Sequence, residues 1–493
     1  MDLVKRSNDM VSPLACGRPA PLEMRRGTGA RRRRCVPLGL ACLLIILCTC
    51  QRIQPATALP PLEHLAAPAT LVARITEPTP TLTSAPLRPD FGKLAYVLQG
   101  DVWTVTPNHP APQQVTHGGR ARSPRWSPSG RRIAYLCDLE LRVFDTESGQ
   151  DWPVGNPVSS FSWSPTDDRL VFVMGSGVLR LALIDFEKGQ RTLLIPHERK
   201  EPGLIGRFVW HPDGGAIAYE WRHGLRDHGV WLIPSAGGEP RELYASGLPQ
   251  AGEAVPAGWT PDGAYVLFWQ GPEPSMSLYA DGTALYALPA SGGSPIALAE
   301  AVLLHPDFIA AHPTRPTRLA VVTGGGRGTW SQKRIQVLDL PAAVSKVLTP
   351  DTLAAVSPAW SPDGRSLLYV AMPDRGDLVG GDPARRGLMA RKLWMWTEAD
   401  GVSRQLTDDE QYRDEAPRWS RDGRHILFAR MEADGAASLW MLDAEDQSIW
   451  PVVDRLGPIP GPAESWFGFY GHVDWSAAFD WWQPPASGER ETP

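Results

Sequence analysis

Trp360-Ser361-Pro362-Asp363-Gly364 is the stretch that decides the fold, because close copies of it recur along the chain. The other copies that begin with Trp are Trp126-Ser127-Pro128-Ser129-Gly130, Trp163-Ser164-Pro165-Thr166-Asp167, Trp210-His211-Pro212-Asp213-Gly214, Trp259-Thr260-Pro261-Asp262-Gly263 and Trp419-Ser420-Arg421-Asp422-Gly423. A degenerate copy, Ala311-His312-Pro313-Thr314-Arg315, fills the gap between 259 and 360, and Trp475-Ser476 begins an eighth. Self-similarity at a period of about 50 residues indicates a repeat architecture.

Each repeat is predicted to form four β-strands. The Trp-bearing strand ends in a turn, because Pro presets the backbone, Asp caps with its side chain and Gly accepts a left-handed conformation. A β-prone run such as Arg132-Ile133-Ala134-Tyr135 follows, then a run that often carries Trp, such as Val230-Trp231-Leu232-Ile233, then a run ending near Gln405-Leu406-Thr407. Four short strands per unit predict one blade of an all-β propeller, with the Trp wedged between neighbouring blades.

The two ends of the repeat region complement each other. Residues 94–116 supply three strands without a Trp strand, and His472-Val473-Asp474-Trp475-Ser476 supplies a Trp strand with no unit after it. Their pairing would close the ring and remove the exposed strand edges. Eight starts predict eight blades, and seven remain open if the unit around Ala311 is an insertion.

The repeats resemble the WD40-like repeats of TolB-type propellers, which share Trp-Ser-Pro-Asp-Gly; the resemblance covers residues 91–482 and implies the fold. Similar repeats occur in periplasmic scaffolds and in the propeller domains of prolyl-oligopeptidase-like enzymes, so the resemblance leaves the function open. An oligopeptidase would also need a hydrolase domain with a Gly-x-Ser-x-Gly nucleophile turn. We expect neither here, since Gly175-Ser176-Gly177 reads as a hairpin turn.

The N-terminal 90 residues predict export and tethering. Arg31-Arg32-Arg33-Arg34 precedes an apolar stretch over 36–48, which is too short to span a bilayer comfortably. Leu47-Cys48-Thr49-Cys50 resembles a bacterial lipoprotein signal with lipid attachment at Cys50; simple cleavage and an uncleaved anchor are the alternatives, and Met24 is a possible start. Residues 51–90 hold eight Pro and six Thr and predict a disordered tether, and 483–493 a disordered tail.

Charge and cysteine content narrow the choice of partners. The net charge is -5, and nine of the Lys/Arg residues lie within the first fifty, so the body is acidic and a poor nucleic-acid binder. Five of the six cysteines also lie in the first fifty residues, which leaves Cys137 as a small hydrophobe. We therefore expect a monomer at the extracytoplasmic face of a bacterial membrane, or secreted, whose partner is a protein or a cell-envelope polymer.

Metal ligands are sparse in the sequence. His223 and His228 flank Asp227 in one predicted loop, where scattered surface His residues are the simpler interpretation. Asp408-Asp409-Glu410 with Asp414-Glu415 could suit calcium but lacks EF-hand spacing, so a solvated acidic loop is favoured. We predict no cofactor, with calcium as a weak alternative.

Long connections mark one face of the ring as a binding surface. In a four-stranded blade these connections emerge opposite the Ser-Pro-Asp-Gly turns, and varied loops on a rigid scaffold are where binding usually resides. The candidate binding residues mix aromatic and charged types: Arg222, Trp269, Arg327, Trp330, Arg375, Asp377, Arg385, Arg386, Trp466 and Tyr470. By contrast, Val209, Ala257, Ala310 and Ala359, near the motif on the inner strands, predict an apolar channel.

The sequence thus favours a non-catalytic, membrane-tethered binding scaffold. The alternatives are a propeller hydrolase or lyase acting on polysaccharide or peptide, and a carbohydrate-binding module. Carboxylates and histidines lining the channel would favour an enzyme.

Overall fold

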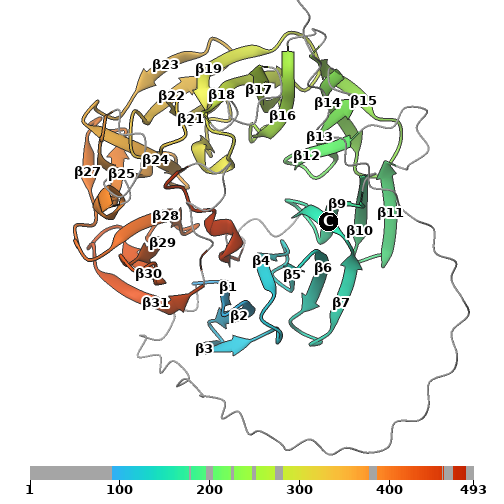
Figure 1. Cartoon of the computed structure of the whole chain (residues 1–493), viewed down its shortest axis with the longest axis horizontal. Coiled ribbons are helices and arrows are strands. Elements are labelled where there is room, and N and C mark those ends of the chain that lie inside the picture. Colours follow the sequence, from blue (N-terminus) through green and yellow to red (C-terminus); the bar gives the residue numbers. More distant parts are fainter. Residues whose placement is uncertain are drawn as a thin grey trace, which may run out of the picture. The chain divides into compact units, whose positions relative to one another are not determined.

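The structure, a computed structural model, describes residues 91–176, 179–195, 204–223, 227–246, 251–272, 281–376, 386–457, 459 and 470–484. In this part of the chain, eight four-stranded antiparallel sheets follow one another around a ring (Figure 1). The all-β propeller is therefore confirmed, with eight blades rather than seven. No helix in the described ranges has the length and apolar character needed to cross a membrane. Cys50, the export segment and the tether lie outside these ranges.

The first four blades follow the chain from the inside of the ring outward, one after another. Blade 1 holds β4 (Ala121–Trp126), β5 (Arg132–Cys137), β6 (Glu140–Asp145) and β7 (Asp151–Gly155). Blade 2 holds β8 (Val158–Trp163), β9 (Arg169–Met174), β10 (Arg180–Asp185) and β11 (Gln190–Ile195). Blade 3 holds β12 (Leu204–Trp210), β13 (Ala216–His223), β14 (Asp227–Pro234) and β15 (Arg241–Ala245). Blade 4 holds β16 (Ala251–Trp259), β17 (Tyr265–Pro272), β18 (Thr283–Pro289) and β19 (Ile296–Val302).

Blades 5 to 7 repeat this order, and the last blade combines both ends of the ring. Blade 5 holds β20 (Ile309–Ala311), β21 (Arg318–Thr323), β22 (Arg334–Asp339) and β23 (Val344–Val347). Blade 6 holds β24 (Leu353–Trp360), β25 (Ser366–Pro373), β26 (Lys392–Thr397) and β27 (Ser403–Gln405). Blade 7 holds β28 (Arg413–Trp419), β29 (His425–Met431), β30 (Ala437–Asp443) and β31 (Ile449–Leu456). Blade 8 pairs β32 (Phe479–Trp482) with β1 (Lys93–Leu98), β2 (Asp101–Thr106) and β3 (His109–Gln114).

The repeated motif forms the first hairpin of each blade as predicted. In blade 6 the Ser361 hydroxyl donates to Asp363 (2.6 Å), and Asp363 accepts the Arg365 backbone N–H (3.0 Å). Gly364 sits at φ +73°, in the left-handed region that disfavours a side chain. A side chain there would also collide with His312 of blade 5, because a Cβ would lie 2.1 Å from its ring. The motif therefore shapes the turn and also the contact between blades.

The motif tryptophans join neighbouring blades through their indole nitrogens. Trp163 Nε1 donates to the Arg125 carbonyl (3.0 Å), and Trp419 Nε1 donates to the Ala359 carbonyl (3.2 Å). In both cases the acceptor is the residue just before the motif position on the preceding inner strand. A buried indole N–H needs such a partner. The predicted wedge role is confirmed at these positions.

Ring closure uses a different strand from the one predicted. Trp475–Ala477 forms a short 3₁₀ helix, η3, and the strand that pairs with β1 is β32. Trp481 lies opposite Leu94 as Trp126 lies opposite Ile133, so Trp481 is the motif tryptophan of blade 8. The prediction that 472–476 forms this strand is wrong, because Asp474 caps a helical turn by accepting the Ser476 N–H.

Candidate functional site: a charged cluster at the channel

The inner strands bring charged residues to the channel, although the sequence predicted an apolar lining. Arg125, Arg418 and Asp480 all directly precede a motif tryptophan, the position that Val209 and Ala359 occupy in other blades. Their common position places them on β4, β28 and β32, the innermost strands of blades 1, 7 and 8. The apolar residues are present as predicted, but they describe only part of the ring. The signal was in the sequence, in the residue before each Trp.

The segment 470–478 carries more charged groups into the hub of the ring. It follows blade 7 and leads into β32, and its red ribbon lies inside the ring (Figure 1). Tyr470 exchanges backbone hydrogen bonds with the 327–329 turn: its N–H donates to the Arg327 carbonyl (2.8 Å), and its carbonyl accepts from Thr329 (2.9 Å). Farther along, Arg125 donates to the Ser476 carbonyl. We call residues 470–478 the hub segment.

Two histidines and two aspartates meet where the hub segment approaches the turn between blades 4 and 5. His305 caps the 3₁₀ helix η1 (Pro306–Phe308) in that turn, and its ring lies 4.6 Å from the His472 ring, centroid to centroid. One oxygen of Asp307 lies 3.4 Å from His305 Nδ1 and 3.4 Å from His472 Nε2. His305 Nε2 lies 3.9 Å from Asp474. We call these four residues the channel cluster.

The environment of the channel cluster shifts the titration of its members. Burial, together with the nearby His305, lowers the pKa of His472 to about 3, so His472 is neutral. Burial raises the pKa of Asp307. Burial would also raise the pKa of Asp474, but the interaction with His305 and the hydrogen bonds from Ser476 outweigh it and hold that pKa well below its usual range. A neutral imidazole thus lies beside a carboxyl of raised pKa.

Arginines from two blades interact electrostatically with the channel cluster. Arg207 on β12 interacts electrostatically with Asp307 and Asp474, and its guanidinium stands over the Trp269 ring at 5.5 Å. Arg418 pairs with Asp480 (3.6 Å) and lies 4.3 Å from the Phe479 ring centroid. Burial lowers the pKa of both guanidinium groups, yet arginine stays charged at neutral pH. The site therefore offers fixed positive charge next to histidine and aspartate side chains.

A hollow of about 670 Å³ lies among the motif hairpins of blades 1, 2 and 8. Its lining includes Trp126, Trp163 and Asp480, and Asp480 also pairs with Arg418. This volume falls within the range of ordinary ligand pockets. Through Asp480, the hollow is connected to Arg418 of the channel.

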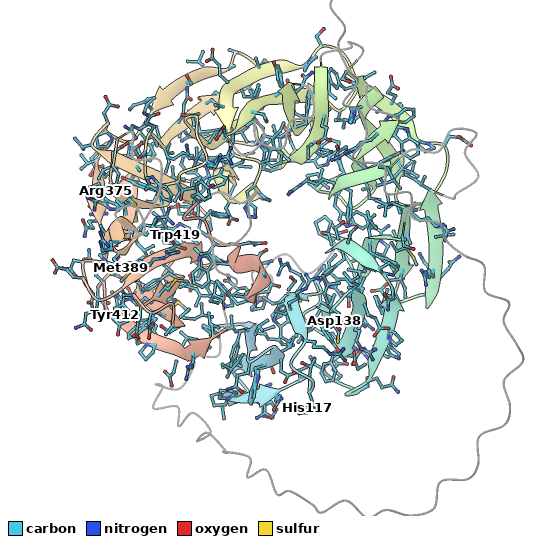
Figure 2. The ribbon with its side chains drawn as sticks, viewed as in Figure 1. His117, Asp138, Arg375, Met389, Tyr412 and Trp419 are labelled. Carbon is cyan, nitrogen blue, oxygen red and sulfur yellow. The ribbon has the colours of Figure 1, made fainter. Side chains whose placement is uncertain are left out.

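Among the predicted binding residues, Arg327 and Trp330 contact Tyr470, and Trp330 and Trp269 are buried. Arg327 stands over the Tyr470 ring at 5.8 Å, and Trp330 stacks on Tyr470 at 6.1 Å, so these residues hold the hub segment. Trp330 and Trp269 are both buried. Arg375 is exposed at the outside of the ring (Figure 2).

Arg222 and Arg386 are the remaining predicted residues that the structure describes. Arg222 bridges Glu220 (2.5 Å) and Glu253 (2.8 Å) between blades 3 and 4. Arg386 is exposed. Asp377, Arg385 and Trp466 lie outside the described residues.

The residues that the sequence offered as metal ligands also lie in surroundings other than those predicted. Asp414 and Glu415 are buried on β28 and pair with Arg430 (2.9 Å) and Arg391 (2.5 Å), so they do not belong to a solvated loop. His228 is buried on β14 beside Glu220 and Glu253 rather than on the surface. The side chains of His223 and Asp227 lie outside the described part. The sequence missed His305 and Asp307, which no repeat pattern marks.

Comparisons with known proteins give one sequence relative and several structures of similar fold. No family model matches. Over 209 residues, 38% of this chain, the sequence is 26% identical to an uncharacterized peptidase of Bacillus subtilis, YuxL. The chain covers 29% of that protein's length.

Solved structures share the fold. Dipeptidyl peptidase 4 of Porphyromonas gingivalis matches with a TM-score of 0.53 at 10% identity, over 74% of this chain and 58% of that one. TolB of Acinetobacter baumannii matches with a TM-score of 0.32 at 17% identity, over 73% and 64% of the two chains. These likenesses concern the fold alone, and the eight blades themselves confirm the predicted propeller.

The peptidase relative corrects the expected function. A non-catalytic scaffold was the main expectation, and the sequence similarity to a peptidase contradicts it. The alternative of a propeller hydrolase acting on peptide agrees better with that similarity. The charged channel agrees with it as well, since carboxylates and histidines were the feature expected of an enzyme.

Proposed function

We propose that this propeller is a hydrolase that acts on peptides. The observation that carries the proposal is the similarity over 209 residues to a protein named as a peptidase. The channel offers the chemistry that such a role needs. Arg207 and Arg418 supply cationic donors for a peptide's carboxylates and carbonyls, and the channel cluster supplies further polar groups beside them.

The hollow among the motif hairpins of blades 1, 2 and 8 supplies the place for the peptide. Aromatic walls at Trp126 and Trp163 suit apolar side chains, and Asp480 suits an amino terminus. A peptide bound there would contact Asp480, which is paired with Arg418.

Peptide hydrolysis by the full chain tests this proposal. The purified chain is incubated with a mixture of peptides of varied sequence, and with polysaccharides in parallel, and new termini are identified by mass spectrometry. We expect cleaved peptides and intact polysaccharides. Peptides that stay intact while a polysaccharide is cleaved, or a mixture in which nothing is cleaved, would contradict the proposal.

Binding at the channel is tested with two arginine variants. Arg418→Gln removes a charge beside the hollow, whereas Arg404→Gln removes an exposed charge on the outer strand β27. A charge-assisted hydrogen bond contributes about 1.5–3 kcal/mol, so we expect Arg418→Gln to weaken peptide binding by about tenfold or more. Arg404→Gln should bind peptide as the parent does. Fluorescence anisotropy measures the peptide affinity of both variants, and their melting temperatures verify that both are folded. Equal affinities of the two variants would show that the peptide binds elsewhere.

A further inference from the structure

Three members of the channel cluster have the spacing of ligands around one small cation. One donor atom each of His305, Asp307 and His472 lies within 4.8 Å of the others. The two contacts to the Asp307 oxygen are both 3.4 Å. Two ligand atoms each about 2.1 Å from a tetrahedral zinc ion lie about 3.4 Å apart. The same contacts are longer than ordinary N–H···O hydrogen bonds, which measure about 2.7–3.2 Å.

We propose that His305, Asp307 and His472 bind a divalent transition-metal ion of the zinc class. Two imidazole nitrogens with one carboxylate oxygen form a ligand set that zinc accepts, with a fourth position for water. Calcium and magnesium prefer all-oxygen sites. The inference does not depend on the proposed peptide activity.

Asp474 stands where an outer-shell partner of a metal-bound histidine is expected. His305 directs Nδ1 toward Asp307 and Nε2 toward Asp474 at 3.9 Å. Asp474 is itself fixed, because it accepts the Ser476 N–H at 3.0 Å. A carboxylate on the far nitrogen orients a ligating imidazole and increases its basicity.

One existing contact must give way for the metal to bind. His305 Nδ1 accepts the Asp307 backbone N–H at 3.3 Å, a long bond that a metal–nitrogen bond would replace. Nearby Arg207 and Arg418 oppose a cation, while Asp307 and Asp474 favour it. Site affinity therefore depends mainly on the ligand spacing rather than on a strong negative potential.

A second group of donors is less suited to a metal. Glu220, His228 and Glu253 also lie within 4.8 Å of one another. There Arg222 already pairs with both glutamates, at 2.5 and 2.8 Å. A cation at that place would have to displace a guanidinium, so the channel cluster is the better site.

A bound metal would link the hub segment to the turn between blades 4 and 5. His472 belongs to the hub segment, and His305 and Asp307 belong to the turn between blades 4 and 5. A ligand that binds only the folded state stabilises it in proportion to the logarithm of its concentration. Zinc should therefore raise the melting temperature of the protein.

The test measures zinc binding to the full chain after chelator treatment. Titration calorimetry with zinc chloride is compared between the parent, His472→Gln and Asp307→Asn, with His117→Gln as the matched control. His117 is exposed and lies at the lower rim of the ring, away from the channel (Figure 2). Cobalt(II) absorption spectra report whether the ligands are nitrogen and oxygen rather than thiolate. Melting temperatures without metal verify that each variant folds.

We expect His472→Gln and Asp307→Asn to lose one equivalent of bound zinc and the zinc-dependent rise in melting temperature. His117→Gln should keep both. Asp474→Asn should lower the zinc affinity of this site by about 10–100-fold, as changes to outer-shell partners do. Equal zinc stoichiometry in His472→Gln and His117→Gln would overturn the proposal, and so would a cobalt spectrum dominated by thiolate bands.

Discussion

Gly364 shows how a single residue serves both the turn and the neighbouring blade. Its φ of +73° strains any side chain, and an added Cβ would lie 2.1 Å from the His312 ring. Gly401 also has a positive φ, +68°, but open space around its Cβ position. The pair therefore separates backbone strain from steric collision.

We expect Gly401→Ala to lower the free energy of unfolding by about 1 kcal/mol, from backbone strain alone. Gly364→Ala should lower the free energy of unfolding by about 1–3 kcal/mol more than Gly401→Ala does, because the His312 side chain must move. Denaturant titrations of both variants measure the difference. Equal losses would show that the blade contact yields without cost.

At the scale of elements, the sequence predicted the repeated hairpins well and the closing strand poorly. Trp360-Ser361-Pro362-Asp363-Gly364 encodes its turn locally, so the pattern is visible in the chain. The closing strand is decided by pairing with β1, almost 400 positions earlier, which no local pattern shows. A weak signal lay in Trp482-Gln483-Pro484, which keeps the Trp-x-Pro spacing of the motif one position beyond Trp481. Likewise, the channel cluster depends on the path of the hub segment across the ring.

Removal of β32 should open the ring. A chain ending after Ala478 lacks Phe479 and Trp481, both buried, and leaves the edge of β1 unpaired. Losing a buried aromatic side chain costs about 3–5 kcal/mol, and exposed strand edges aggregate. We expect a lower melting temperature and soluble oligomers by size-exclusion chromatography. A chain ending after Pro484 keeps the pairing and should remain monomeric and melt as the parent does.

At the scale of the whole molecule, a buried ionic network joins blades 5, 6 and 7 with the hub segment. Glu415 pairs with Arg391 at 2.5 Å and Arg413 at 3.0 Å, and accepts the Trp475 indole N–H at 2.7 Å. Arg391 also donates to Thr329 Oγ1 (2.6 Å) and to the Gly471 carbonyl (2.6 Å). The carboxylate is thus the common partner of several distant segments.

This network predicts sensitivity to acid. Burial alone would raise the pKa of Glu415, but Arg413 and Arg391 lower it to about 2, below the ordinary 4.5. Its stabilising effect is complete above pH 4.5 and is lost as the pH falls toward 2. Glu415→Gln leaves two buried arginines without their counter-charge, so we expect a loss of about 3–5 kcal/mol at neutral pH.

Urea unfolding at several pH values measures the effect. The parent should lose stability between pH 4.5 and 2, while Glu415→Gln should depend less on pH over that interval. Identical pH profiles for parent and variant would show that other carboxyls dominate acid unfolding.

Closure by β32 also sets an order of events during synthesis. β1 is among the first parts of the ring to be translated, and its inner partner is among the last. Until Trp482 has been translated, blades 1 to 7 can form, but β1 has no partner on its inner edge. Contacts of such long sequence separation are slow to form and leave the nascent chain exposed to wrong pairings. A chaperone that shields one β edge would therefore benefit this protein most in the final moments of its translation.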